Sequence, residues 1–136
     1  MDYKRMIDER NASGYINHLD INVVEIREGY AKTEVLIGDG HINPMGAAHG
    51  GLIFSLADVT AGSCANSFGN KASTLNSSIN FLAPAMKGSK LTGESKLLKN
   101  GKTVKVIDVE IKDESGKMIA RGNFSFFDLG EPLFED

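Results

Sequence analysis

HGGLIFSLADVTAGSCANSF, residues 49–68, is the stretch that decides the fold of this 136-residue chain. From Gly51 to about Phe68, apolar side chains occur on every face of a helix instead of forming one stripe. A helix that is apolar all round is normally buried in a core. The pattern therefore predicts a long central helix that the rest of the chain must cover.

The segments that would cover this helix resemble β-strands. Within residues 30–37, for example, Ala31 and Val35 fall on the same face of a strand with a period of two, as in a half-buried strand. Asn100-Gly101, between two such runs, is a strong hairpin signal. The predicted strands are residues 21–27, 30–37, 74–83, 91–99, 102–112 and 117–127. One buried helix with about five to six antiparallel strands is an α+β arrangement, in which the sheet must curl around the helix.

Length and composition fit one domain over residues 1–136, with 41% hydrophobic and 24% charged residues. Residues 1–14 are predicted as an N-terminal helix, capped by Asp2, with its lead-in, and residues 128–136 as an acidic tail.

Several functional classes are excluded by composition. The net charge of −3 argues against nucleic acid as a partner. The single Cys64 excludes an intramolecular disulfide and a zinc site of the CxxC type. The N-terminus lacks the apolar region of a signal peptide, and no stretch approaches the roughly 18 apolar residues of a membrane span. We therefore expect a soluble cytoplasmic protein without a membrane partner.

Asp58 is the most informative candidate for chemistry. It lies in the middle of the apolar helix, with no basic residue within one turn and with Ala57, Ala61 and Gly62 leaving space beside it. Carboxylates in apolar settings shift their pKa or find hydrogen-bond donors, and they are frequent at functional sites. The alternative is a structural carboxylate that bonds a neighbouring strand or faces solvent.

The His49-Gly50-Gly51 segment is the second candidate. Two glycines at a helix N-terminus expose N–H groups at the positive end of the helix dipole, where they can stabilise an oxyanion. The alternatives are a tight turn that needs glycine and a structural role for His49. His18 and His41 have no supporting partners and are interpreted as structural.

The spacing of these two candidates has a geometric consequence. Gly50 and Asp58 are eight residues apart, which separates their backbones by roughly 12 Å along a helix. Groups that act on one reacting atom must lie within about 3 Å of it. If both are catalytic, we expect two helices to lie antiparallel across a two-fold axis, with two active sites per dimer.

Two polar clusters have weaker signals. One predicted strand carries hydroxyls and amides, of which one could orient Asp58 or a water molecule: Thr74, Asn76, Ser77, Ser78 and Asn80. Four lysines surround the hairpin: Lys96, Lys99, Lys102 and Lys105. They form either the solvated end of the hairpin or a binding site for ligand phosphates.

Together these segments resemble the hotdog-fold thioesterases of the PaaI type. The matching motifs are NPMGAAHGG at residues 43–51, LAD at 56–58, NFLAPA at 80–85 and NGK at 100–102. The likeness extends over roughly residues 15–127. It implies a long helix wrapped by a curved antiparallel sheet, and homodimers, often assembled as tetramers, with active sites at the subunit interface.

The resemblance also implies roles for individual residues. Asp58 matches the nucleophile or general base, and Gly50 the residue whose N–H polarises the thioester carbonyl. Asn43 matches the residue that positions water or the carbonyl, His49 orders the loop, and Thr74 supplies a hydroxyl beside the aspartate. The residues expected to contact CoA are Gly51, Pro84, Lys99, Gly101 and Lys102.

We therefore expect hydrolysis of acyl-CoA to free acid and CoA. No metal or redox cofactor is required, because CoA is part of the substrate. The alternatives are a non-catalytic acyl-CoA binding module and a hotdog hydratase or dehydratase, which usually pairs a histidine with a carboxylate at a different spacing.

Overall fold

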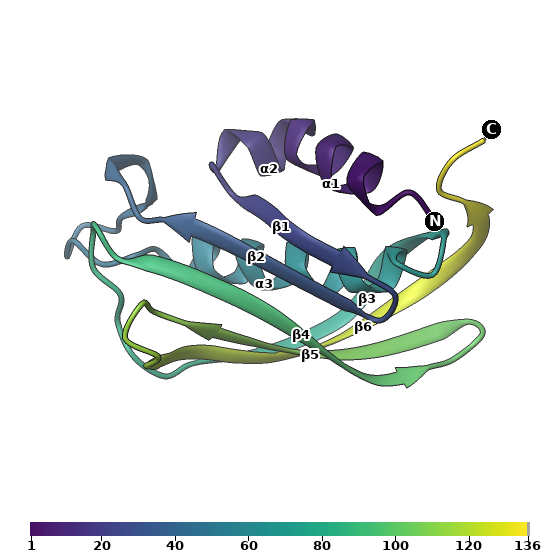
Figure 1. Cartoon of the computed structure of the whole chain (residues 1–136). Helices are drawn as coiled ribbons and strands as arrows, with labels where there is room; N and C mark the ends of the chain where they lie inside the picture. Colours follow the sequence, from purple (N-terminus) through teal and green to yellow (C-terminus); the bar gives the residue numbers. More distant parts are fainter. Residues whose placement is uncertain (136) are drawn as a thin grey trace.

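The computed structural model describes residues 1–135 and confirms the α+β prediction. A long helix lies in the hollow of a single six-stranded sheet, and two shorter helices lie at the N-terminus (Figure 1). The elements in chain order are α1 (Tyr3–Ala12), α2 (Gly14–His18), β1 (Asn22–Arg27), β2 (Tyr30–Leu36), the 3-10 turn η1 (Asp39–His41), α3 (Gly50–Asn66), β3 (Asn70–Phe81), β4 (Lys90–Asn100), β5 (Val104–Lys112) and β6 (Met118–Pro132).

The sheet is antiparallel throughout, with the strand order β1-β2-β4-β5-β6-β3. It curves around α3, while α1 and α2 cover the side of α3 that the sheet leaves open (Figure 1). Thirteen of the 17 residues of α3 are buried, which confirms the prediction from its all-round apolar pattern. Within residues 1–135, no helix has the length and apolar character needed to cross a membrane.

Some element boundaries differ from the sequence-based expectation. Gly14, expected to end the helical N-terminus, instead begins α2 after the N-cap residue Ser13. β3 begins earlier than predicted, at Asn70, and β6 continues to Pro132, inside the segment expected as an acidic tail. These two strands pair along almost their whole length, and that pairing extends both of them. Asp136, the last residue of the expected tail, lies outside the described residues.

The two edges of the sheet differ in how they are covered. At the β1 edge, the side chain of Asn11 bonds both backbone groups of Val23, at 2.7 and 3.0 Å, and takes the place of a further strand. At the other edge, the outer backbone groups of residues 71–81 in β3 have no partner within residues 1–135. A long uncovered edge is a site for pairing with another strand.

A β-bulge at Leu75 changes which side chains of β3 face the helix. Thr74 lies opposite Phe126 on β6 and Ser77 lies opposite Phe124, so that Leu75 and Asn76 together take the place of one regular step. Directly opposed residues share a face, and both phenylalanines are buried in the core. Thr74 and Ser77 therefore both face α3, although they are three residues apart.

Candidate active site

Asp58 meets one side chain of the sheet. It is half-buried on α3, and its Oδ1 accepts a hydrogen bond of 2.9 Å from the Thr74 hydroxyl on β3. The bulge described above is what turns Thr74 toward the helix. Of the five polar residues on this strand, Thr74 is thus the one that contacts the carboxylate, at the uncovered edge of the sheet.

The N-terminus of α3 offers one free donor. The His49 ring caps the helix, since its Nδ1 accepts a bond of 2.8 Å from the Gly51 N–H, and Leu52 N–H bonds the His49 carbonyl. The Gly50 N–H has no acceptor within residues 1–135. Gly51, expected to contact CoA, therefore has its N–H engaged within the chain, and Gly50 presents the donor that an oxyanion would meet.

A surface groove lies in front of this donor. Its lining includes Asn43, Gly50, Phe81 and Pro84, so three predicted site residues share it. The ring of Phe81, at the end of β3, lies 3.5 Å from the point where a side chain on Gly50 would begin. The Gly50 N–H therefore lies beside the aromatic ring, at the groove between the loop and β3.

Asn43 shapes the loop before the helix. Its Oδ1 accepts hydrogen bonds from the Met45 and Ala47 N–H groups at 2.9 and 3.1 Å, and its backbone N–H bonds the Ala47 carbonyl. Asn43 lines the groove, and its Nδ2 has no partner within residues 1–135. His41, interpreted as structural, is buried between the Gly38 N–H and the Leu19 carbonyl, which confirms that interpretation.

The chain alone does not assemble all predicted site residues. Gly50 is the first residue of α3 and Asp58 the ninth, so the uninterrupted helix holds them roughly 12 Å apart. The hairpin that carries Lys99, Gly101 and Lys102 lies at the far end of β4 (Figure 1). β4 has eleven residues, so its hairpin end lies roughly 35 Å from its first residue. The first residue of β4 is at the end of the strand that lies near the Gly50 groove.

The lysines at the hairpin do not form one surface cluster. Lys105 is buried, and its ammonium group donates to Asn100 Oδ1 at 2.8 Å and to the Gly101 carbonyl at 3.2 Å, and lies 3.5 Å from the Asp128 carboxylate. The expectation that Lys105 could receive ligand phosphates is therefore wrong, because it ties the hairpin to β6. The other three lysines are exposed.

Arg10 is a neighbour of the site that sequence reasoning did not find. It reaches from α1 to α3, where it bonds Asn66 Oδ1 at 2.8 Å and the Val59 carbonyl at 3.5 Å. Asp58 has no basic residue within one turn of its own helix, but the fold brings this one from 48 positions earlier. The available signal was that Arg10 shares a helical face with the apolar Met6.

The comparisons with known proteins agree with one another. The family description "Thioesterase superfamily" matches residues 45–120. A putative esterase from Archaeoglobus fulgidus is 34% identical over 113 residues, 83% of this chain and 73% of that protein. The acyl-coenzyme A thioesterase PaaI of Escherichia coli is 32% identical over 102 residues, 75% of this chain and 73% of that protein. The structure of the E. coli PaaI protein from the phenylacetic acid degradation operon has a TM-score of 0.90 at 26% identity, covering 95% of this chain and 94% of that one.

A hypothetical thioesterase protein from Streptococcus pneumoniae, solved with coenzyme A, is a further structural match. Its TM-score is 0.79 at 29% identity, covering 82% of this chain and 88% of that one. The same protein has been solved with an aspartate-to-alanine and with a threonine-to-alanine substitution, at positions 16 residues apart. Asp58 and Thr74 are separated by the same number of residues.

Proposed function

Because the chain belongs to the thioesterase superfamily, as a PaaI-like hotdog thioesterase, we propose that it hydrolyses acyl-CoA to free acid and CoA at a site shared by two subunits. The observation that carries this proposal is the Asp58 carboxylate, held by Thr74 at the uncovered edge of the sheet. The matched spacing of the substituted aspartate and threonine in the streptococcal protein supports it.

Two groups carry out the reaction, a hydrogen-bond donor and a carboxylate that acts as base or nucleophile. The Gly50 N–H, at the positive end of α3, polarises the thioester carbonyl and stabilises the oxyanion that forms on it. The partner subunit's Asp58 either removes a proton from an attacking water or attacks the carbonyl itself to form an anhydride that water hydrolyses. In both routes the C–S bond breaks, and CoA leaves as a thiolate that takes up a proton.

Pairing of β3 with its copy would bring the two groups together. If two β3 strands pair antiparallel about an axis between Ser77 and Ser78, the partner's Phe81 comes to lie opposite Thr74. Because Phe81 packs beside Gly50 and Thr74 bonds Asp58, this register brings each Gly50 toward the partner's Asp58. The exposed Leu75, at 55% accessibility, would be covered by the same contact.

An antiparallel dimer also suggests where CoA lies. The Gly50 groove and the β4–β5 hairpin lie at opposite ends of one chain, so pairing places the hairpin of one subunit at the groove end of the other (Figure 1). Lys99 and Lys102 of the partner subunit would then face the phosphates, and Pro84 would line the path to the thioester.

The assay that tests this function is thiol release from a panel of short, medium-chain and aryl acyl-CoA esters, run beside hydration of crotonyl-CoA. We expect turnover that releases CoA, with a clear preference within the panel. Saturable binding of the esters without turnover would identify a binding module instead, and hydration without thiol release would identify a hydratase.

Removing the Thr74 hydroxyl is expected to lower kcat about 10-fold. The bond to Asp58 is charge-assisted, and such bonds contribute about 1.5 kcal/mol, which is close to one factor of ten in rate. Steady-state kinetics of Thr74→Ala and Thr74→Ser measure this effect. Serine retains the hydroxyl and should retain most of the activity, whereas an alanine variant as active as the serine variant would exclude a role for this bond.

A further inference from the structure

Lys105 is a buried cation that the proposed reaction does not use. It lies on β5 and, like Ile107 two positions later, faces the core side of the sheet. Its ammonium group donates to Asn100 Oδ1 at 2.8 Å and to the Gly101 carbonyl at 3.2 Å. The same group lies 3.5 Å from the Asp128 carboxylate. Two hydrogen bonds to the β4–β5 hairpin and one ion pair to β6 thus occupy this cation.

A β-bulge at Leu98 brings Asn100 to the ammonium group. Leu98 is an extra residue of β4, because the residues before and after it lie opposite consecutive residues of β5. Directly opposed residues share a face, and Asn100 lies opposite Lys105. Lys99, one position earlier, faces the other side of the sheet and is exposed. The bulge therefore separates a tethered asparagine from a free lysine at the end of the strand.

The turn of the hairpin is held at two points. The Gly101 N–H bonds the Val104 carbonyl at 3.0 Å, and a Cβ atom on Gly101 would collide with that oxygen. The Thr103 carbonyl accepts a bond of 2.8 Å from the Asp128 N–H, so β6 holds the second half of the turn. Lys105 holds the first half through the Gly101 carbonyl. The backbone on both sides of residue 102 is thereby fixed to the sheet.

The hairpin end presents two cations without a partner in this chain. Lys99 and Lys102 are exposed, and within residues 1–135 neither has a carboxylate at ion-pair distance. The charge of Lys105 is paired with Asp128 instead. A lysine is a point charge on a flexible stem, and ordering such a side chain or its loop costs binding free energy. Fixing the backbone that carries both lysines before a ligand arrives reduces this cost.

We propose that Lys105 is a positioning residue for CoA, whose ammonium group holds the turn so that Lys99 and Lys102 together face the phosphates of the bound CoA. The proposal rests on the function proposed above, and in particular on the placement of the phosphates at this hairpin. A buried ion pair is weak evidence for stability, because removing the charges from water offsets their attraction. The two bonds from the ammonium group to the hairpin give this buried charge a role in binding.

The test compares acyl-CoA with the S-acyl-pantetheine that carries the same acyl group and has no phosphates. Lys105→Met retains the apolar stem and removes the ammonium group. We expect KM for acyl-CoA to rise about 10-fold, since the ordering of two lysine side chains then opposes binding, while kcat stays within about twofold. Both constants for the pantetheine ester should stay within about twofold, because it has no group for the lysines to bind. An equal change for both esters, or no change in a folded variant, overturns the proposal.

A second variant avoids an unpaired buried charge. Lys105→Met alone leaves the Asp128 carboxylate without its cation, which is strongly destabilising for a buried pair. Lys105→Met combined with Asp128→Asn removes both charges, and the same selective rise in KM for acyl-CoA is expected. Asp128→Asn alone keeps the ammonium group on the hairpin and should leave the ratio of the two kcat/KM values within about twofold. A double variant with the wild-type ratio contradicts the proposal even if Lys105→Met does not fold.

A third comparison tests whether Lys105 acts through the exposed lysines. Lys99→Ala combined with Lys102→Ala should raise KM for acyl-CoA at least as much as Lys105→Met does, with the pantetheine ester unaffected. Adding Lys105→Met to this pair should cause no further rise, because the groups that it positions are gone. A full additional rise of about 10-fold would show that Lys105 acts by another route, and the proposal would be wrong.

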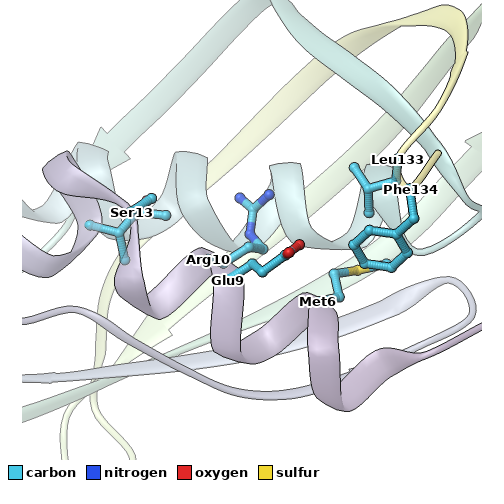
Figure 2. A pocket seen from close by; sticks show the side chains of 7 residues that line it. Met6, Glu9, Arg10, Ser13, Leu133 and Phe134 are labelled. Atoms are coloured by element: carbon cyan, nitrogen blue, oxygen red, sulfur yellow. The ribbon is translucent and has the colours of Figure 1, made fainter. Parts of the chain in front are cut away.

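A control for general loss of stability lies at the other end of the same series of hydrogen bonds. Asn70 donates to Asp128 at 3.1 Å, its carbonyl accepts a bond of 2.9 Å from Asn66, and Asn66 Oδ1 accepts one of 2.8 Å from Arg10. Figure 2 shows the Arg10 side chain, which points from α1 toward α3 beside a pocket. Arg10→Gln should lower the midpoint of thermal unfolding and leave the ratio of the two kcat/KM values within about twofold. A ratio changed as much as in Lys105→Met would mean that any destabilisation produces the effect, which contradicts the proposal.

The levels of the proposal fail differently. If neither ester is hydrolysed, the proposed function fails and the role of Lys105 fails with it. If both esters are hydrolysed but the paired alanine variant binds acyl-CoA normally, hydrolysis stands, and the placement of the phosphates and the positioning role are both wrong. If that variant is impaired but the Lys105 variants are not, only the inference about Lys105 is wrong.

Discussion

Asp58→Asn is expected to lower kcat for acyl-CoA hydrolysis by about a factor of 10³, the middle of the range for losing a general base. Asparagine has the same shape and retains an oxygen that can accept the Thr74 hydrogen bond, so the substitution removes the charge and little else. Thiol release under single-turnover and steady-state conditions measures the loss. Near-identical circular dichroism and unfolding midpoints would show that the fold persists.

A matched control is available on α1. Asp8 is exposed and pairs with Lys4 at 2.7 Å, so Asp8→Asn changes the same charge at the surface and should leave turnover unchanged. A folded Asp58→Asn protein with the turnover of this control would remove Asp58 from the mechanism. Accumulation of a covalent acyl-enzyme in the wild type would distinguish a nucleophile from a general base.

Gly50→Pro is expected to lower kcat about 10²-fold, as found for loss of one oxyanion donor. Proline removes the N–H at the first position of a helix, where its ring is tolerated, and His49 before it already has the extended backbone that proline requires. Gly50→Ala is the control: it keeps the N–H, and its Cβ would meet the Phe81 ring at an ordinary 3.5 Å. Kinetics of both variants separate the N–H from the shape of the residue, and equal losses would exclude the donor role.

Mixing these two inactive variants tests whether the site is shared. When Asp58→Asn and Gly50→Pro subunits are unfolded and refolded together, each mixed dimer should contain one site with both defects and one with neither. A statistical mixture should then regain roughly a quarter of wild-type activity. If each chain carried its own complete site, no activity would return, because every subunit would hold one of the two defects.

The architecture could be predicted wherever one local pattern dominates. The all-round apolar pattern of α3 and the Asn100-Gly101 hairpin led to the correct class of fold, because both signals are contained in a few consecutive residues. The missed α2 and the early start of β3 depend on neighbours that are distant in sequence. The strand propensity of a local segment takes no account of β6, which is the pairing partner along the whole of β3.

The candidate site shows the same limit. The spacing of Gly50 and Asp58 on one helix could be read directly, since a helix has a fixed rise per residue. The contact of Arg10 with α3 could not, because its position depends on how α1 packs across α3. Lys105 was misassigned for a related reason: only the pairing of β5 with β6 brings it to Asp128 and buries it.

The bulge at Leu75 makes the position of the Thr74 hydroxyl depend on the number of residues in β3. It makes the orientation of Thr74, relative to the rest of the strand, depend on how many residues follow it, since one residue fewer at this point would turn the hydroxyl to the outer face of the sheet. In relatives of this chain, the count of residues between the hydroxyl and the part of the strand that corresponds to residues 77–81 should therefore be more restricted than the identity of those residues. Insertions and deletions there would abolish activity more readily than substitutions. During evolution, the length of this strand should therefore be conserved more strictly than its composition.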